Sequence, residues 1–126
     1  MTATILVADD SATMRMIVQT TLSGAGWRVL TAGNGQRALE LARGNRVDLL
    51  VSDWNMPVMD GLALIRGLRV EPGYQDLPVL VLTTEDDGRS KNAARNLGVR
   101  GWLNKPLDPG VLVELASELL SEQSDA

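Results

Sequence analysis

The sequence predicts an α/β fold with a doubly wound, five-stranded parallel sheet, (βα)5 in outline, and three observations support this prediction. Five short apolar or β-branched runs alternate with segments whose apolar residues recur at helical spacing. Gly, Pro, Asn and Asp, which mark turns and helix ends, separate these segments. Strands that alternate with helices are joined by right-handed crossovers and form a parallel sheet covered on both faces.

The first strand is expected at residues 4–8 (TILVA), directly before a polar turn at 9–11. The helix after this turn is indicated by apolar residues at the spacing of one helix face. These residues, expected to face inward, are Met14, Ile17, Val18, Leu22 and Ala25. Gly24 and Gly26 are expected to end the helix.

The second strand is expected at residues 28–32, and Asn34 is placed to cap the helix that follows. The apolar face of that helix consists of Ala38, Leu41 and Ala42. Gly44 and Asn45 are expected to stop it.

The third strand is expected at residues 48–53 (DLLVSD), and the turn 54–60 leads into the next helix. That helix is expected to run to about Val70, because Pro72 and Gly73 mark the following loop. Its apolar side consists of Leu62, Ile65 and Leu68.

The fourth strand, at residues 78–82 (PVLVL), is the most apolar of the five. The helix expected at about 87–97 has a weak apolar face, which consists of Ala93, Ala94 and Leu97. A short fifth strand is expected at 101–104.

Asp108 is placed to cap the last helix, with Pro109 at its first position. The residues expected to face inward are Val111, Leu112, Leu115, Ala116 and Leu119. The 126 residues, 44% of them hydrophobic, suit one domain, which we assign to 1–121, followed by a short polar tail at 122–126.

Composition excludes several classes of function. Cys and His are both 0, which rules out disulfides, thiolate or imidazole zinc sites and imidazole catalysis. A net charge of -4 and few aromatic residues argue against binding to nucleic acid. No stretch approaches the roughly 20 apolar residues of a membrane span, and no basic segment precedes an apolar run at the N-terminus. We therefore expect a cytoplasmic protein that binds neither nucleic acid nor membranes.

Chemically active side chains follow the strands of the predicted sheet. Ligands of doubly wound sheets bind beyond the carboxyl ends of the strands, near the switch point of strand order. The residues at that edge are Asp9, Asp10, Asp53, Thr83, Thr84 and Lys105. A single Asp at a strand end is commonly a turn former or helix cap, so the interpretation depends on their joint placement.

Convergence of Asp9, Asp10 and Asp53 would require positive charge among them. Two carboxylates about 4 Å apart repel by roughly 4 kcal/mol at an effective dielectric of about 20. Lys105 supplies one positive charge and a divalent cation would supply two. An all-oxygen site with few protein ligands favours Mg²⁺. Beside such an ion, Asp53 is suited to act as a nucleophile toward a phosphoryl group.

Four segments of the sequence resemble the response-regulator receiver domain. They are LVADDS at 6–11, VSDWNMPVMDG at 51–61, VLTTE at 81–85 and GWLNKP at 101–106. The resemblance covers essentially the whole chain and is nearest to the stand-alone chemotaxis regulators of the family. It implies a flavodoxin-like strand order of 2-1-3-4-5 and a signalling phospho-acceptor that catalyses only its own phosphorylation and dephosphorylation.

The resemblance also implies roles for residues around the acceptor. Asp53 matches the phospho-acceptor, and Asp9 with Asp10 matches the acidic pair that binds Mg²⁺. The backbone carbonyl of Asn55 matches a further metal ligand. The side chains of Asn55 and Glu85 match positions that tune the lifetime of the phosphoryl group.

Other matched residues belong to the conformational switch with which the family responds to phosphorylation. Thr83 matches the hydroxyl that bonds a phosphoryl oxygen, and Lys105 matches the lysine that pairs with the phosphoryl group. The peptide bond between Lys105 and Pro106 is expected to be cis. Trp102 stands where the chemotaxis regulators carry a tyrosine, so its larger indole is a departure from their pattern; packing on the fourth helix is the alternative role.

The partners follow from the same resemblance. The chain has no histidine and no GxxxxGK[ST] loop, so the phosphoryl donor is a sensor histidine kinase, a histidine phosphotransfer protein or a small acyl phosphate. The output surface is the face of the fourth helix, fifth strand and fifth helix, with the flagellar motor switch as one candidate target. We expect a monomer when the protein is unphosphorylated.

Residues 89–104 contain four basic residues and no acidic ones. The basic residues are Arg89, Lys91, Arg95 and Arg100. An acidic partner segment is one explanation of this run, and a solvated helix face is the other.

Several other functions compete with this interpretation. A haloacid-dehalogenase phosphatase would carry a second Asp two residues after its nucleophile, where this chain has Asn55. A flavodoxin-like cofactor binder would need a phosphate loop, but residues 9–12 are acidic. A phosphorelay intermediate, a phosphate sink or a receiver cut from a longer regulator are closer alternatives that the sequence leaves open.

Overall fold

The computed structural model describes residues 2–84 and 88–124 of the chain. Within these ranges, strands and helices alternate from one end to the other. Their bounds in chain order are β1 Thr4–Ala8, α1 Ala12–Gly24, β2 Arg28–Ala32, α2 Gly35–Gly44, β3 Leu49–Asp53, α3 Gly61–Arg69, β4 Val79–Thr83, α4 Gly88–Asn96, β5 Gly101–Asn104 and α5 Pro109–Ser124.

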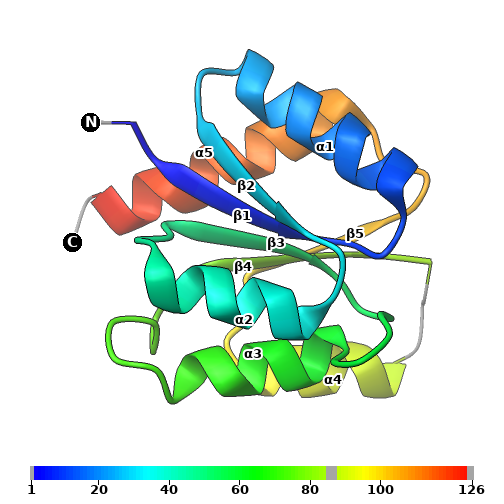
Figure 1. Cartoon of the computed structure of the whole chain (residues 1–126). Helices are drawn as coiled ribbons and strands as arrows, with labels where there is room; N and C mark the ends of the chain where they lie inside the picture. Colours follow the sequence, from blue (N-terminus) through cyan, green and yellow to red (C-terminus); the bar gives the residue numbers. More distant parts are fainter. Residues whose placement is uncertain (1, 85–87, 125–126) are drawn as a thin grey trace.

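The strands form one parallel sheet in the order β2-β1-β3-β4-β5, which confirms the predicted fold class and strand order (Figure 1). The chain passes from β1 outward to β2 and then crosses to β3 on the other side of β1. The switch in strand order therefore lies between β1 and β3, where ligands of doubly wound sheets bind.

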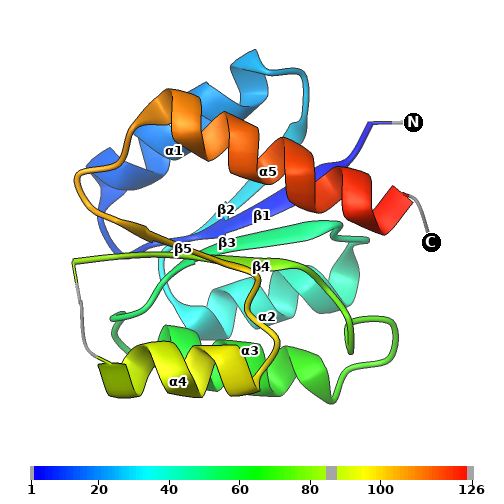
Figure 2. The same ribbon diagram turned by 180° about the vertical axis from the view of Figure 1, so that it is seen from behind.

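Helices cover both faces of the sheet. α1 and α5 lie on one face, and α2, α3 and α4 lie on the other (Figures 1 and 2). Leu49 of β3 belongs to the buried cluster on the α1 and α5 side, and its neighbour Leu50 belongs to the cluster on the other side. This alternation is the signature of a strand buried on both faces.

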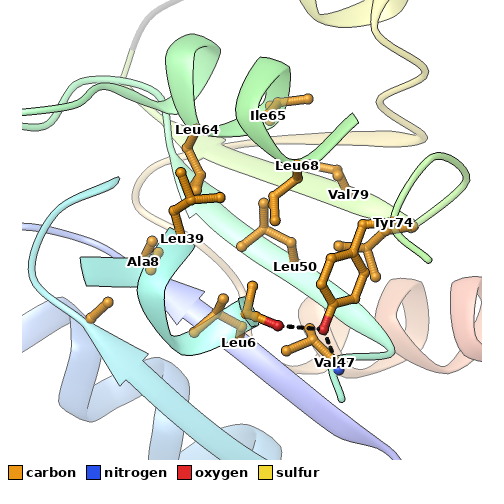
Figure 3. Packing of buried hydrophobic residues seen from close by; sticks show 14 of the residues in the cluster. Leu6, Ala8, Leu39, Val47, Leu50, Leu64, Ile65, Leu68, Tyr74 and Val79 are labelled. Atoms are coloured by element: carbon orange, nitrogen blue, oxygen red, sulfur yellow. Dashed lines mark hydrogen bonds between the residues drawn. The ribbon is translucent and has the colours of Figure 1, made fainter. Parts of the chain in front are cut away.

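Leucines from two helices fill the face covered by α2 and α3. Leu39 of α2 and Leu64 and Leu68 of α3 belong with Leu50 of β3 to one buried cluster (Figure 3). The last three are 0% exposed, so the cluster fixes α3 against the strand that ends at Asp53. Burial of one such side chain contributes roughly 1.5–3 kcal/mol to folding.

Tyr74, in the loop between α3 and β4, lies at the edge of this cluster and is 9% exposed. Its hydroxyl oxygen accepts a hydrogen bond from the N–H of Val47 at 3.1 Å (Figure 3). The same hydroxyl lies 2.7 Å from the carbonyl oxygen of Ala42 and 2.6 Å from that of Asn45, to which its proton can be donated. Tyr74 thus ties the loop after α3 to the end of α2 and the start of β3.

Side-chain oxygens cap the starts of several helices. Asn34 caps α2 as predicted, and Asp108 accepts a hydrogen bond from the N–H of Gly110 at 2.8 Å at the start of α5. Ser11 caps α1, and Asp60 caps α3. These caps satisfy N–H groups that have no partner within the helix.

Three residues expected to face inward are exposed instead. Ile17 of α1 and Val111 of α5 expose 42% and 38% of their surface, and Ala25, the C-cap of α1, is also exposed. The prediction is wrong for all three. Helical spacing defines an apolar face, but the strip that the sheet and the other helices cover is narrower, and Ala25 lies beyond Gly24, the last residue of α1.

Element boundaries differ slightly from the predicted ones. β3 begins at Leu49 rather than at 48, and β4 ends at Thr83 rather than at 82. α4 is described from Gly88 to Asn96, and position 87 of the predicted helix lies outside the described residues. α5 runs to Ser124, into the segment predicted to be a polar tail, since no Gly or Pro interrupts the chain after Gly110. No helix in residues 2–84 and 88–124 is long and apolar enough to cross a bilayer.

Candidate functional site

The carboxyl ends of four strands meet at one edge of the sheet. Parallel pairing sets Ala8 of β1 beside Ser52 of β3, and Asp53 of β3 beside Leu82 of β4. Thr83, which ends β4, pairs with Asn104 of β5. The residues at and just after these positions are therefore neighbours in space, as the sequence predicts.

Three carboxylates come together at this edge. Asp9, Asp10 and Asp53 each offer an oxygen, and these oxygens lie within 4.8 Å of one another. Asp9 is 1% exposed and Asp53 is 8% exposed, whereas Asp10 is open to solvent. Two of the three negative charges are thus shielded from water, which makes their mutual repulsion stronger than it would be on a surface.

Hydrogen bonds to the β1–α1 loop, to α1 and to β2 fix Asp9. Its Oδ1 accepts from the N–H of Ser11 at 2.9 Å, which forms an Asx turn. Its own N–H donates to the carbonyl of Ala32 at 3.1 Å, and its carbonyl oxygen accepts from Nη1 of Arg15 at 2.7 Å. These hydrogen bonds hold Asp9 in position, whereas Asp10 is exposed to solvent.

Lys105 joins two of the carboxylates. Its Nζ donates to Oδ2 of Asp9 at 2.9 Å and to Oδ2 of Asp53 at 3.2 Å, and its side chain is 14% exposed. The N–H of Lys105 donates to the carbonyl of Thr83 at 2.9 Å, which continues the pairing of β5 with β4. The peptide bond from Lys105 to Pro106 is cis, the geometry that the family resemblance implied.

Burial and charge shift the pKa values of this pair. Burial raises the pKa of Asp53; the Lys105 ammonium opposes this, and the charge of Asp9 adds to it. Burial acts to lower the pKa of Lys105, but its hydrogen bonds to Asp9 and Asp53 and their charges outweigh that influence and raise it. Lys105 is therefore held as an ammonium, and Asp53 is a more basic carboxylate than one in water.

The loop after β3 closes tightly around Asp53. Oδ1 of Asp53 accepts a hydrogen bond from the N–H of Trp54 at 2.8 Å. The N–H of Gly61, which begins α3, donates to the carbonyl of Trp54 at 2.9 Å. A Cβ on Gly61 would lie 2.5 Å from the carbonyl oxygen of Asp53, so only glycine allows this approach.

The donor set fits a divalent cation that prefers oxygen ligands. Three carboxylates around one ammonium leave an excess of two negative charges among these residues. A single Mg²⁺ would neutralise that excess, and it requires only a few protein oxygens because it retains several waters. Asp9, Asp10 and Asp53 are thus the residues that would hold it.

The remaining predicted site residues lie at different depths. Thr83 is 0% exposed at the end of β4, while Thr84 and Asn55 are exposed. Glu85 lies outside the described residues. Trp102 is half-buried in β5, the strand that pairs with β4, at whose end Thr83 lies.

A contact between two tryptophans was not predicted. The ring centroids of Trp54 and Trp102 lie 5.5 Å apart at an interplanar angle of 52°. Nζ of Lys91 in α4 lies 5.9 Å from the centroid of the Trp102 ring. Nε1 of Trp102 is a buried donor without a hydrogen-bond partner, the only such side-chain atom found in the described part of the chain. Residue spacing carries no signal for this contact, because it joins segments that meet only in the folded sheet.

The fold and this edge define a doubly wound α/β domain with a site of acids and lysine at its switch point. Residues 5–117 match the family described as the response regulator receiver domain, and the chain belongs to this family of signalling proteins. The predicted family is thereby confirmed.

Several chemotaxis proteins are similar to this chain over most of its length. The chemotaxis protein CheY homolog of Campylobacter jejuni is 40% identical over 122 residues, which cover 95% of this chain and 94% of the relative. The CheY of Pseudomonas aeruginosa is 38% identical over 111 residues, with 87% and 90% covered.

Solved structures share the same fold. The Vibrio cholerae chemotaxis protein CheY4 superposes with a TM-score of 0.90 at 38% identity and covers 94% of this chain and 99% of its own. A response regulator from Burkholderia multivorans is 50% identical with a TM-score of 0.77, covering 94% of this chain and 95% of its own.

Proposed function

We propose that this chain is a receiver that accepts a phosphoryl group on Asp53 and passes the signal to a protein partner in chemotaxis. One observation carries the proposal: Lys105 bridges Asp9 and Asp53 at 2.9 and 3.2 Å inside a cluster of three carboxylates. The excess negative charge of the three acids suits a divalent cation, and Lys105 is a fixed donor beside the nucleophile. Positive groups of this kind are what phosphoryl transfer to an aspartate requires.

The transfer would use Asp53 as the nucleophile. An oxygen of its carboxylate forms a bond to phosphorus as the bond from phosphorus to the donor nitrogen breaks. The electron pair of that bond remains on the donor imidazole, which takes up a proton from solvent. The raised pKa of Asp53, caused chiefly by burial, makes the carboxylate a better nucleophile than a fully hydrated one.

Asp9, Asp10 and Asp53, with the backbone carbonyl of Asn55, would hold Mg²⁺. When bound, this ion supplies the positive charge that offsets the phosphoryl oxygens. Lys105 provides the second positive group, since its ammonium already lies 3.2 Å from Oδ2 of Asp53.

The donor would be a phosphohistidine on a sensor histidine kinase or on a histidine phosphotransfer protein. The chain has no histidine of its own, so the phosphorylated imidazole must come from another molecule. A small acyl phosphate can replace this donor, because the attack by Asp53 requires only a phosphoryl group with a good leaving group.

The signal would leave through the face of α4, β5 and α5. A phosphoryl group carries about -1.5 to -2 charges, so donors are drawn toward it. Thr83, buried at the end of β4, and Lys105, whose Nζ lies 3.2 Å from Oδ2 of Asp53, are the candidates for this movement. Trp102 follows on β5 as the switch aromatic, and Asn55 with Glu85 would set the lifetime of the phosphoryl group.

Labelling with acetyl phosphate tests the acceptor. Wild-type protein with Mg²⁺ is expected to gain one phosphoryl group, measured as intact mass, whereas Asp53→Asn gains none. Glu114→Gln on the exposed side of α5 is the matched control, because it removes the same charge from a solvated position. Stable labelling of folded Asp53→Asn protein would contradict the proposal.

The chemotaxis role is tested by a pull-down with beryllofluoride-treated and untreated protein. Capture of a flagellar motor component by the treated form supports an output role. Capture of a histidine phosphotransfer protein alone would favour the phosphorelay or phosphate-sink alternatives.

A further inference from the structure

The pairing of β1 with its neighbouring strands ends just before two acids of the site. Ala8 is the last residue of β1 to pair, with Ala32 of β2 and with Ser52 of β3. One more hydrogen bond ties the chain to β2, from the N–H of Asp9 to the carbonyl of Ala32 at 3.1 Å. The carbonyl of Asp9 belongs to the next peptide group, which joins Asp9 to Asp10. This peptide group is therefore oriented by a partner outside the sheet.

That partner is the side chain of Arg15. Its Nη1 donates to the carbonyl oxygen of Asp9 at 2.7 Å. Arg15 lies in the first turn of α1, where its own N–H donates to the carbonyl of Ser11 at 2.9 Å. Side chains of a helix lean toward the N-terminus of that helix, so the guanidinium reaches back to the loop that carries both acids. A hydrogen bond from a charged donor is roughly twice as strong as a neutral one.

Gly33, in the loop after β2, leaves room for this guanidinium. A Cβ at Gly33 would lie 3.3 Å from Nη1 of Arg15 and 3.8 Å from its Cζ. The φ of Gly33 is not positive, so the backbone at this position does not itself require glycine. The side chain of Arg15 is thus the reason for a glycine here.

We propose that Arg15 is a positioning residue for the Mg²⁺ site, because it sets the orientation of the peptide group between Asp9 and Asp10. A turn of this peptide group changes ψ of Asp9 and φ of Asp10, and so moves the two side chains relative to each other. Their oxygens lie within 4.8 Å of each other and of an oxygen of Asp53. The assignment rests on the proposed function for the metal site, and it adds a residue that supplies no ligand.

The charge of Arg15 and its hydrogen bond act on metal binding in opposite directions. A guanidinium repels a metal ion, so loss of its charge alone would tighten Mg²⁺ binding. Loss of the hydrogen bond would weaken Mg²⁺ binding, because partners that orient metal ligands contribute to affinity. A variant that keeps the charge separates the two effects. Arg15→Lys is such a variant, since its shorter side chain ends in one ammonium and lacks the planar fork of nitrogens.

Titration of isotope-labelled protein with magnesium chloride at constant ionic strength tests the proposal. The reporter is the amide resonance of Trp54, whose N–H donates to Oδ1 of Asp53 at 2.8 Å. Arg15→Lys is expected to raise the Kd for Mg²⁺ by about fivefold, less than the loss of a bond to a ligating group itself. Arg37→Lys is the matched control, because Arg37 is exposed on α2 and pairs with Glu40 at 3.2 Å. An equal Kd for the two variants would overturn the proposal.

Gly33→Ala is a second test that leaves Arg15 in place. The added methyl group is expected to displace the guanidinium and to raise the Kd by about twofold, the low end for residues in contact. In the Arg15→Lys background the same substitution is expected to have no effect, because the displaced group is already gone. Gly24→Ala is the matched control, since a Cβ at Gly24 meets nothing within 4 Å. An equal effect of Gly33→Ala in both backgrounds would contradict the role of Arg15.

Hydrogen exchange in metal-free protein separates this proposal from the proposed function. The N–H of Ser11 donates to Oδ1 of Asp9 at 2.9 Å, so its exchange rate reports how firmly that carboxylate is held. Arg15→Lys is expected to accelerate exchange at Ser11 and not at Leu50, which is 0% exposed in β3. Faster exchange at Ser11 in a protein that binds no Mg²⁺ would count against the proposed function alone. Unchanged exchange at Ser11, or equal acceleration at Leu50, would overturn the role of Arg15.

Discussion

At the scale of single residues, the site sets burial against charge. Asp53 is 8% exposed, so burial makes its ionised form unfavourable in free energy, and the charge of Lys105 offsets this only in part. Lys105 is bound by two carboxylates and keeps its own charge firmly. The two side chains thus differ: Asp53 is a carboxylate whose charged form is destabilised by burial, and Lys105 is an ammonium that two carboxylates hold in place.

The raised pKa of Asp53 predicts a pH-dependent effect of Asp53→Asn. Because burial raises that pKa in the folded state, the folded protein binds a proton at higher pH than the unfolded chain, whose value is about 3.8. The contribution of Asp53 to the free energy of unfolding therefore falls as the pH rises from about 3.8 through the raised pKa of the folded state. At neutral pH, ionised Asp53 destabilises the fold.

In metal-free buffer, Asp53→Asn is expected to have a higher free energy of unfolding than wild type at pH 7. The difference should disappear as the pH falls below about 3.8, where wild-type Asp53 is neutral in both states. Urea unfolding across this pH range measures it, with Glu114→Gln as the solvated control. A difference that persists unchanged at the lowest pH would contradict the explanation.

Val58, in the loop after Asp53, has a backbone conformation that valine rarely adopts. Its φ is 69°, and its side chain is 81% exposed, so packing does not compensate for the strain. Val58→Asn is expected to raise the free energy of unfolding by about 1 kcal/mol, because Asn tolerates the left-handed region. Val70→Asn is the matched control: Val70 is 78% exposed at a φ of -99° and should change stability by less than about 0.5 kcal/mol. An equal effect of the two substitutions, measured by urea unfolding, would show that backbone strain is not the cause.

At the scale of elements, loops at the two ends of the sheet perform different tasks. At the carboxyl ends, the β1–α1 loop presents Asp9, and the last residue of β3 is Asp53. At the amino ends, Tyr74 ties two loops together through its hydroxyl at 3.1 Å from the N–H of Val47 (Figure 3). β3 runs between these ends, from Leu49 to Asp53, so the anchor and the site are separated by the length of one strand.

Tyr74→Phe is expected to lower the free energy of unfolding by about 1–3 kcal/mol, because the buried N–H of Val47 and the carbonyl of Ala42 lose their partner while the ring packing is kept. Acetyl phosphate labelling should stay at the wild-type level, because the anchor lies at the opposite edge of the sheet from Asp53. Urea unfolding measures the first effect and intact mass the second. Loss of labelling in folded Tyr74→Phe protein would show that the two ends are coupled.

At the scale of the whole molecule, most of the architecture could be predicted from the pattern of apolar and polar residues in the sequence. Alternating apolar runs and helical stripes predicted the elements, and polar residues at strand ends predicted that Asp9, Asp10 and Asp53 converge. These features depend on local spacing and on one rule about parallel sheets, so a single sequence contains them.

Other features depend on contacts between distant segments and could not be predicted. Ile17 and Val111 lie on apolar helix faces, yet the width of the covered strip is set by the neighbouring elements. The contact of Trp54, just after β3, with Trp102 of β5 joins segments that β4 separates in the sheet order. The strain at Val58 is likewise invisible in its residue type.

Binding of Mg²⁺ should stabilise the entire fold, because the three carboxylates converge only when β1 and β3 are paired. At free Mg²⁺ about 100 times its Kd, linkage raises the free energy of unfolding by about 2.7 kcal/mol, which corresponds to a rise in Tm of roughly 10 °C for a domain of this size. Differential scanning calorimetry measures this rise, with NaCl at matched ionic strength to account for screening. Asp10→Asn removes an exposed carboxylate of the proposed Mg²⁺ site without altering the core, so its metal-free Tm should resemble that of wild type while its response to Mg²⁺ is largely lost. An equal rise in Tm for both proteins would show that Mg²⁺ binds elsewhere. The excess negative charge of the three carboxylates would then not be the cause of binding.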